Sequence, residues 1–154
     1  MTFSTLYPSP IGTLLLTSDG KALTGLIPTN ENCDAGPCDP PEVINKACRW
    51  LDGYFTGNPA AVDFPISPAG TDFQLRVWDL LQAIPYGKTV TYGQLAQQLD
   101  EKMSPQAVGQ AVGKNPIAIL IPCHRVVGSR GQLTGYAWGI EKKTWLLAHE
   151  EESK

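Results

Sequence analysis

Residues 117 to 127 read Ile-Ala-Ile-Leu-Ile-Pro-Cys-His-Arg-Val-Val. The apolar residues of this run predict a buried strand, which a cysteine, a histidine and an arginine interrupt. Burying polar groups costs free energy. A thiol beside an imidazole and a guanidinium can become a thiolate, because nearby positive charge and proton acceptance lower its pKa from about 8.5. Cys123 is therefore the first candidate for a nucleophile.

The helices that precede this run have clear start signals. Thr71 and Gln74 fit a capping box, followed by one apolar helical face: Phe73, Val77, Leu80, Leu81 and Ile84. Pro85-Tyr86-Gly87 stops that helix. The same pattern at Thr91 and Gln94 predicts a helix over 92–99.

A third helix is predicted from the N-cap Ser104 and the first-turn Pro105 to Gly113. Two helices joined by a short turn after an initial helix is the order of a helix-turn-helix. The third helix consists largely of Ala, Val and Gly, which either lets its backbone approach a partner closely or serves tight packing in the core.

The N-terminal part reads as a small sheet with one helix. Short apolar runs separated by turn residues predict three antiparallel strands over 3–7, 13–17 and 22–27. A loop over 29–41 and a helix over 41–55 follow. Because residues 63–70 contain two prolines and a glycine, we expect a boundary there, with domains over 1–68 and 69–154.

Length and composition are ordinary for a globular protein. The 154 residues are enough for one domain or two small ones, and neither a signal peptide nor an apolar run near about 18 residues is present. We expect a cytoplasmic protein without membrane association.

Cysteine spacing gives no metal motif. The four cysteines form no CxxC pair, and disulfides are not expected inside a cell: Cys33, Cys38, Cys48 and Cys123. The histidines, His124 and His149, lie far along the chain from the first three cysteines. We expect no metal site.

The charge distribution is uneven, although the net charge is −3. Residues 102–143 carry six cations against the single acid Glu141: Lys102, Lys114, Arg125, Arg130, Lys142 and Lys143. This predicts a basic face suited to phosphate, with a chance cluster of solvated side chains as the alternative.

The run around Cys123 belongs to a longer pattern. Ile121-Pro122-Cys123-His124-Arg125-Val126 is preceded by Ala107-Val108-Gly109 and Asn115-Pro116, and followed by Gly135-Tyr136 and the segment 145–150. Over residues 71–150 this pattern resembles the methylated-DNA–protein-cysteine methyltransferases, which repair 6-O-alkylguanine in DNA. Ser9-Pro10-Ile11-Gly12 and Tyr54-Phe55-Thr56-Gly57 resemble the more variable N-terminal domain of that family.

The resemblance implies both fold and reaction. We expect an α/β (α+β) protein, with a small RNase H-like N-terminal domain of antiparallel sheet and helix. A C-terminal domain of winged helix-turn-helix type would carry the active-site cysteine. In the implied reaction, Cys123 takes the alkyl group from a flipped 6-O-alkylguanine in double-stranded DNA. The thioether product would leave each molecule spent after one transfer, with no cofactor needed.

The resemblance also assigns the activating residues. His124 would act on Cys123 through a bridging water and be oriented by Glu150 on the last helix. By itself, Glu150 reads as a solvated acid in the run 150–152. Arg125, grouped with the substrate-binding residues, is expected to hold strand and loop together.

Further residues are assigned to DNA by the same resemblance. Tyr92 would press on the phosphate of the flipped nucleotide, and the third helix, with Gln106, Ala107 and Gly109, would lie in the minor groove. Asn115 resembles the family's hinge asparagine, and Lys143 a lysine that approaches the bound base. The pocket would be lined or bordered by five residues: Val126, Ser129, Tyr136, Ala137 and Trp138. We expect a monomer, with cooperative binding on DNA left open, associated with the nucleoid through DNA.

Two positions depart from the common family pattern. Gln106 stands where most members carry an arginine that fills the gap left by the flipped base. It keeps hydrogen-bonding ability but loses charge and reach, so weaker binding or flipping is expected. Trp138 stands where many members have glycine, which predicts a narrower pocket.

Three other functions are consistent with parts of the pattern. A lesion-binding relative without repair activity would lack the reactive cysteine that stands at 123. A transcriptional regulator would need base-reading side chains on a helix that is mostly Ala, Val and Gly. A Cys-His hydrolase would need turnover and an oxyanion site that the sequence does not reveal.

Overall fold

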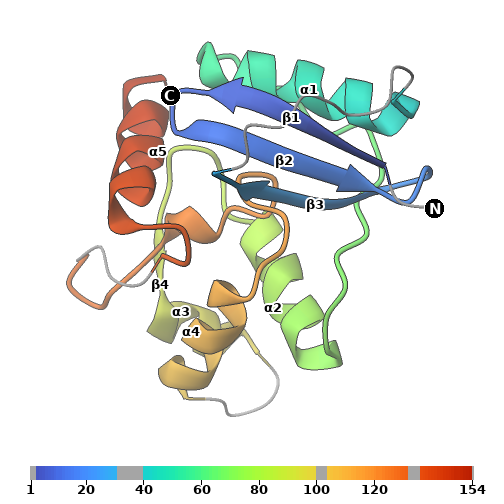
Figure 1. Ribbon diagram of the computed structural model, residues 1–154. Coiled ribbons are helices and arrows are strands. Elements are labelled where there is room, and N and C mark those ends of the chain that lie inside the picture. Colours follow the sequence, from blue (N-terminus) through green and yellow to red (C-terminus); the bar gives the residue numbers. More distant parts are fainter. Residues whose placement is uncertain (1–2, 31–39, 100–103, 132–135, 154) are drawn as a thin grey trace. The chain divides into compact units, whose positions relative to one another are not determined.

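The computed structural model describes residues 3–30, 40–99, 104–131 and 136–153 (Figure 1). The backbone divides into two units, Met1–Ala69 and Gly70–Lys154. Cys33, Cys38 and Lys102 lie outside the described residues, and so does the turn between the second and third predicted helices. Across the described part of the chain, no helix is long and apolar enough to cross a bilayer.

The first unit contains a three-stranded antiparallel sheet in the order β1-β2-β3. Its strands are β1 (Phe3–Ser9), β2 (Gly12–Ser18) and β3 (Leu23–Pro28). The alternation in β2 places Leu14 and Leu16 in the core, while Thr13, Leu15 and Thr17 are only half-buried. The three predicted strands are confirmed.

Helix α1 (Glu42–Phe55) packs on this sheet (Figure 1). Its buried residues recur at helical spacing: Val43, Ile44, Ala47, Leu51 and Tyr54. The chain then returns to the sheet, where the backbone of Leu23 bonds to Pro65 and Ser67 at 2.9 and 2.8 Å. The predicted antiparallel sheet with one helix is therefore confirmed.

The second unit begins with the predicted capped helices. In α2 (Asp72–Gln82) and α3 (Tyr92–Gln98), both halves of each capping box are formed, by Thr71 with Gln74 and by Thr91 with Gln94. In α4 (Pro105–Gly113), the Ser104 hydroxyl accepts from Ala107 N at 3.1 Å. Local side-chain bonds thus fix where each helix starts.

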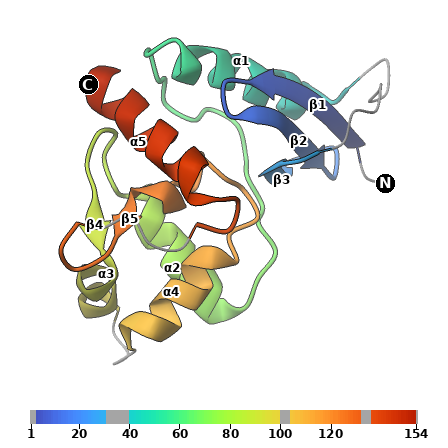
Figure 2. The same cartoon turned by 60° about the vertical axis from the view of Figure 1, so that its left-hand side comes forward.

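Helix α2 contacts both α3 and α4, in the predicted helix-turn-helix order. Trp78, which the predicted apolar face of α2 omitted, is fully buried, and its indole Nε1 donates to the Ala111 carbonyl at 2.9 Å. A parallel pair of two-residue strands, β4 (Val90–Thr91) and β5 (Val126–Val127), adjoins the helices (Figure 2). Helix α5 (Ile140–Ser153) follows.

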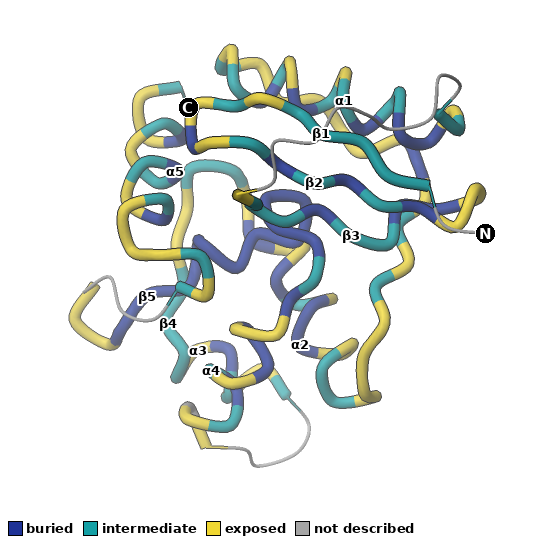
Figure 3. The backbone as a smooth tube through the Cα atoms, viewed as in Figure 1, coloured by how far each residue is buried: buried dark blue, intermediate teal, exposed yellow. Residues whose placement is uncertain are grey.

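Residues 117–127 are buried as expected, but most of the run is not a strand (Figure 3). Ile119 adopts a left-handed φ of 71°, and Cys123–Arg125 form a short 3₁₀ helix, η1. Asn115 holds the loop, because its side chain accepts from Ile117 N at 2.9 Å and donates to the Ile121 carbonyl at 2.8 Å. The predicted strand is therefore wrong before Val126.

Candidate active site

Cys123 lies at the start of η1 with only 4% of its surface exposed. Burial raises the pKa of its thiol to about 11, although Asn115, Lys143 and Tyr136 each act to lower it. The expected depression of this pKa is therefore wrong for the protein without DNA. Removal of water outweighs the polar neighbours, and the Arg125 guanidinium is directed elsewhere. At neutral pH Cys123 is a thiol that requires a base.

His124 supplies an acceptor for a proton. Its Nε2 lies 2.5 Å from Glu150 Oε2, and both side chains are almost completely buried. Burial raises the pKa of Glu150, but bonds and charges from His124 and Arg125 outweigh this and lower it to about 2. Glu150 is thus a carboxylate that can only accept, so Nε2 carries the proton. Nδ1 is left as an acceptor.

Two further observations define the state of this imidazole. Burial lowers the pKa of His124 despite the opposing effect of Glu150, so the ring is neutral at neutral pH. Nδ1 is buried and has no hydrogen-bond partner among the residues that the structure describes. A neutral imidazole with a fixed tautomer and a lone pair on Nδ1 can accept a proton.

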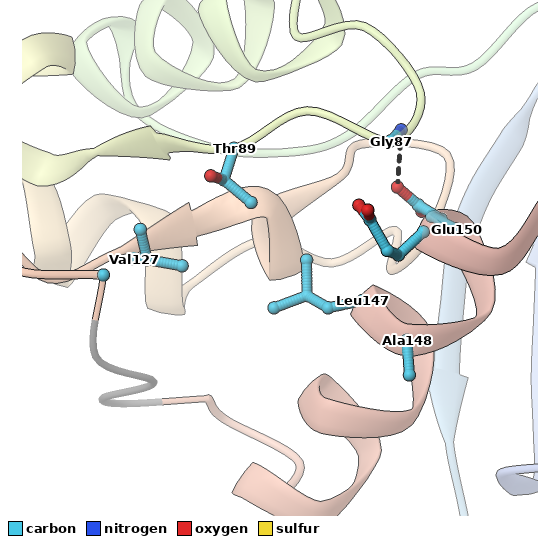
Figure 4. Close-up of a pocket in the computed structure, with 8 residues that line it drawn as sticks. Gly87, Thr89, Val127, Leu147, Ala148 and Glu150 are labelled. Carbon is cyan, nitrogen blue, oxygen red and sulfur yellow. Dashed lines mark hydrogen bonds between the residues drawn. The ribbon is translucent and has the colours of Figure 1, made fainter. Parts of the chain in front are cut away.

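Glu150 is held by more than the imidazole. Arg125 donates from Nε to Oε1 at 2.7 Å and from Nη2 to Oε2 at 3.1 Å, while its Nη1 donates to the Ile84 carbonyl at 2.8 Å. The backbone N–H of Gly87 donates to Oε1 at 3.3 Å (Figure 4). Glu150 therefore joins α5, η1 and the turn after α2.

A cavity of about 430 Å³ lies beside this carboxylate (Figure 4). Glu150 and Gly87 form part of its wall, together with Thr89, Val127, Leu147 and Ala148. Its side formed by β5 and α5 combines the apolar Val127, Leu147 and Ala148 with a second carboxylate, Glu151.

Lys143 and Tyr92 form the other polar part of the site. Lys143 is fully buried, and its Nζ lies 6.0 Å from the centre of the Tyr92 ring. Burial lowers the pKa of Lys143, while the Cys123 thiolate would raise it. Gly109 of α4 faces the same ring, since a Cβ there would lie 3.6 Å from its carbons. The Lys143 ammonium, the Tyr92 ring and helix α4 at Gly109 thus lie close together.

A cleft of about 540 Å³ opens between α4 and the segment before α5. Its lining consists of Gly109, Gln110, Gly113, Lys114, Tyr136 and Ala137. Trp138 borders it indirectly, with its ring edge-on to Tyr136 at 5.2 Å between centroids. Two of the residues predicted for the pocket, Tyr136 and Ala137, therefore share one cleft with Gly109, which was predicted to contact DNA.

The remaining predicted residues occupy different surroundings. Val126 is fully buried in β5, whereas Ser129 and Gln106 are exposed. Ala107 lines a second cleft, of about 270 Å³, on α4. In the described part of the chain, no group of three His, Cys, Asp or Glu side chains is placed to bind a metal.

Sequence reasoning missed several parts of the site. Gly87 was read only as a helix stop, and Ile84 only as an apolar residue, although both bind the Arg125–Glu150 pair through their backbones. Backbone contacts leave no signal in residue type. Gln110 and Lys114 were also missed as cleft residues, and their spacing of four along α4 could have indicated them.

Residues 72–152 match the family model for the 6-O-methylguanine DNA methyltransferase DNA-binding domain, and residues 2–68 match the model for its ribonuclease-like domain. A methylated-DNA–protein-cysteine methyltransferase of Methanosarcina acetivorans is 40% identical over 149 residues, covering 94% of this chain and 96% of the relative.

Solved structures agree. The O6-methylguanine methyltransferase of Mycobacterium tuberculosis superposes with a TM-score of 0.88 at 41% identity, over 100% of this chain and 95% of that one. A structure of the M. tuberculosis protein in complex with DNA gives 0.86 at 42% identity, over 96% and 92%. The predicted fold class is confirmed, and the chain belongs to the methylated-DNA–protein-cysteine methyltransferase family.

Proposed function

We propose that this chain repairs DNA by transferring the alkyl group of 6-O-alkylguanine to Cys123. The observation that carries the proposal is the buried His124, the residue after the protonated Cys123 thiol, whose Nε2 is fixed on Glu150 and whose Nδ1 is left to accept a proton. Family membership supplies the substrate class.

The proposed reaction balances without a cofactor. His124 takes the thiol proton through a water molecule at Nδ1, and the Cys123 sulfur attacks the alkyl carbon in line with the bond to the base oxygen. The carbon–oxygen bond breaks, and its electron pair stays on the oxygen of the guanine. His124 then gives its proton to the guanine. The products are an S-alkyl cysteine and guanine.

We further propose that each molecule acts once. A thioether has no carbonyl group that water could attack, so the sulfur–carbon bond persists where an acyl-enzyme would hydrolyse. The buried position of Cys123, with 4% exposure, also limits access by other thiols.

Base flipping is the proposed route to this buried thiol. A guanine inside a duplex cannot reach it, and extruding a base costs a few kcal/mol. The cleft beside Gly109 and Tyr136 is the proposed entrance, and Tyr92, whose ring faces Gly109, would press on the phosphate of the extruded nucleotide. Because residues 69–154 contain every group in this proposal, we assign both DNA binding and chemistry to them.

The other proposed roles follow from position. Arg125 is a positioning residue, because its guanidinium is engaged by Glu150 and Ile84 rather than by the cleft. Lys143 lies beside both Cys123 and Tyr92, where an ammonium favours the thiolate. Asn115 is the proposed hinge, Gln106 and Ala107 contact DNA, and the pocket is bordered by the remaining predicted residues: Val126, Ser129, Ala137 and Trp138.

The test is the intact mass of the full chain after incubation with duplex DNA containing 6-O-methylguanine. We expect one added methyl group per molecule, on the peptide containing Cys123, with no further turnover in excess DNA. Cys48→Ser, which removes the other thiol in the described residues, should behave like the wild type. Binding of the lesion with no added mass would instead indicate a non-catalytic recogniser, and methylation on another peptide would refute the assignment of Cys123.

A further inference from the structure

The turn that follows α2 contacts both members of the Arg125–Glu150 pair. The Ile84 carbonyl, just after the end of α2, accepts from Arg125 Nη1 at 2.8 Å. Three residues later, the backbone N–H of Gly87 donates to Glu150 Oε1 at 3.3 Å (Figure 4). The segment 84–87 therefore binds the guanidinium through an acceptor and the carboxylate through a donor.

Tyr86, between these two backbone contacts, packs against the same guanidinium. The Cζ atom of Arg125 lies 5.6 Å from the centre of the Tyr86 ring. A guanidinium within about 6 Å of an aromatic ring centre is attracted to the ring, and more strongly where water is excluded. Arg125 is buried, and all three of its side-chain nitrogens already donate hydrogen bonds. The Tyr86 ring thus adds a fourth restraint to this side chain.

The conformation of the turn depends on glycine at position 87. The Lys88 N–H donates to the Pro85 carbonyl at 3.1 Å, which closes a four-residue turn. Gly87 is the third residue of this turn and has a φ of 78°. A type II turn requires a positive φ at that position, which residues with a side chain adopt only at a cost. The N–H that reaches the carboxylate therefore belongs to a residue that has to be glycine.

Both ends of the segment are anchored. At its start, the Ile84 N–H donates to the Leu81 carbonyl of α2 at 3.1 Å. After its end, β4 pairs with β5, where Val90 lies opposite Val126, the residue that follows Arg125. Moving the segment away from Arg125 would break one of these two connections.

We propose that Tyr86 and Gly87 are positioning residues for the proton acceptor His124. They act through the Arg125–Glu150 pair, and the inference rests on the proposed function, in which His124 takes the thiol proton. Arg125 Nε and the Gly87 N–H both donate to Glu150 Oε1. With Oε1 held in this way, Oε2 stays 2.5 Å from His124 Nε2, which fixes the tautomer that leaves Nδ1 open.

The first test is the single-turnover rate of methyl transfer to Cys123, measured over a range of concentrations of duplex DNA containing 6-O-methylguanine. Gly87→Ala should lower the rate at saturating DNA by about tenfold, the order expected for one hydrogen bond to a charged group. The DNA concentration that gives half the maximal rate should not change. Gly57→Ala is the matched control, because Gly57 has a similar φ of 85° in the first unit, and it should keep the wild-type rate.

Tyr86 offers a second variant that leaves the turn backbone intact. Tyr86→Leu removes the ring but keeps an apolar side chain at this half-buried position, and it should lower the saturating rate by about threefold. Tyr86→Phe keeps the ring and should keep the wild-type rate. An equal loss in the two variants would overturn the role of the ring.

A spectroscopic signal of the protein without DNA tests the same inference independently of the reaction. The Nε2 proton of His124, in a short bond to a carboxylate, should give an NMR resonance far downfield of the backbone amides. His149→Gln removes the other histidine of the chain and so identifies the signal. Gly87→Ala and Tyr86→Leu should shift or broaden this resonance, whereas Gly57→Ala should leave it unchanged.

The outcomes separate this inference from the proposed function. Wild-type rates and an unchanged His124 resonance in Gly87→Ala and Tyr86→Leu would overturn the positioning role, while methylation of Cys123 by the wild type still stood. A wild-type chain that acquired no methyl group would refute the proposed function, and the resonance would still decide whether the turn orients the imidazole. Circular dichroism spectra check folding, and Tyr86→Leu decides the question if Gly87→Ala does not fold.

Discussion

Arg125 presents two nitrogens to the Glu150 carboxylate, with Nε 2.7 Å from Oε1 and Nη2 3.1 Å from Oε2. The carboxylate oriented in this way also binds the His124 imidazole. The Arg125 guanidinium therefore orients the His124 imidazole indirectly, through Glu150, which lies 25 positions after Arg125 in the chain.

Arg125→Met should destabilise the fold by about 3–5 kcal/mol, because it leaves a buried carboxylate without its main partner. Urea denaturation of both proteins at neutral pH measures this difference. Arg49→Met is the matched control, since the Arg49–Glu42 pair has side chains 66% and 67% exposed. Exposed pairs contribute about 0–1 kcal/mol, so equal losses in the two variants would contradict the importance of burial here.

Acid should unfold the protein through the same pair. The pKa of Glu150 is about 2 in the fold against an ordinary 4.5, and the pKa of His124 is also lowered from 6.5. The unfolded chain therefore binds more protons than the folded one below pH 6.5. The contribution of both groups to the free energy of unfolding should be fully present above that pH. It should fall below pH 6.5, because His124 is protonated in the unfolded chain but not in the folded one. It should fall further between pH 4.5 and about 2, where Glu150 is protonated in the unfolded chain first.

Urea midpoints at about pH 5 and about pH 2.5 measure the part of this loss that belongs to Glu150. Glu150→Gln, which cannot ionise, should show a smaller difference between the two conditions. Glu151→Gln changes the next residue, which is exposed, and should keep the wild-type difference. If Glu150→Gln were as acid-sensitive as the wild type, the pair would not be the source.

Gln106→Arg should strengthen DNA binding at matched salt and speed methyl transfer. The substitution restores charge and reach at an exposed position near the start of α4, and one more phosphate contact would raise the salt slope by about 0.9. Gln82→Arg is the matched control, because it adds the same charge at the exposed end of α2, and it should leave both affinity and rate as in the wild type. If neither affinity nor rate improved in Gln106→Arg, the expected weakness of Gln106 would be wrong.

Methyl adducts should react at least about tenfold faster than benzyl adducts, a typical discrimination for a pocket of restricted size. The structural reason is Trp138, whose ring lies edge-on to Tyr136 at the cleft. Single-turnover rates on duplexes carrying each adduct give the ratio. Trp138→Gly should raise the benzyl rate more than the methyl rate, and equal wild-type rates on the two adducts would refute the narrow pocket.

The sequence predicted best what is decided locally. The capping pairs at Thr71 and Thr91 identified helix starts because both partners lie within four residues of each other. The strands of the first unit followed from alternation and turn residues. Trp78 was missed, because its partner Ala111 lies 33 residues away.

The run 117–127 shows where periodicity fails. Its apolar residues correctly indicated burial, but the loop is shaped by the Asn115 side chain and by the positive φ of Ile119, neither of which has a periodic signal. Glu150 looked like a solvated acid from its neighbours, and only the family resemblance indicated a role. Its burial depends on Arg125 and His124, which local sequence cannot reveal.

The distance in sequence between Cys123 and Glu150 has a consequence for synthesis. A ribosome makes the thiol 27 residues before the carboxylate that orients its base, since 150 − 123 is 27. When Cys123 has left the ribosome but α5 has not, the Glu150 carboxylate that orients the His124 imidazole is still missing. The base proposed for Cys123 is therefore oriented only after the last helix has been made.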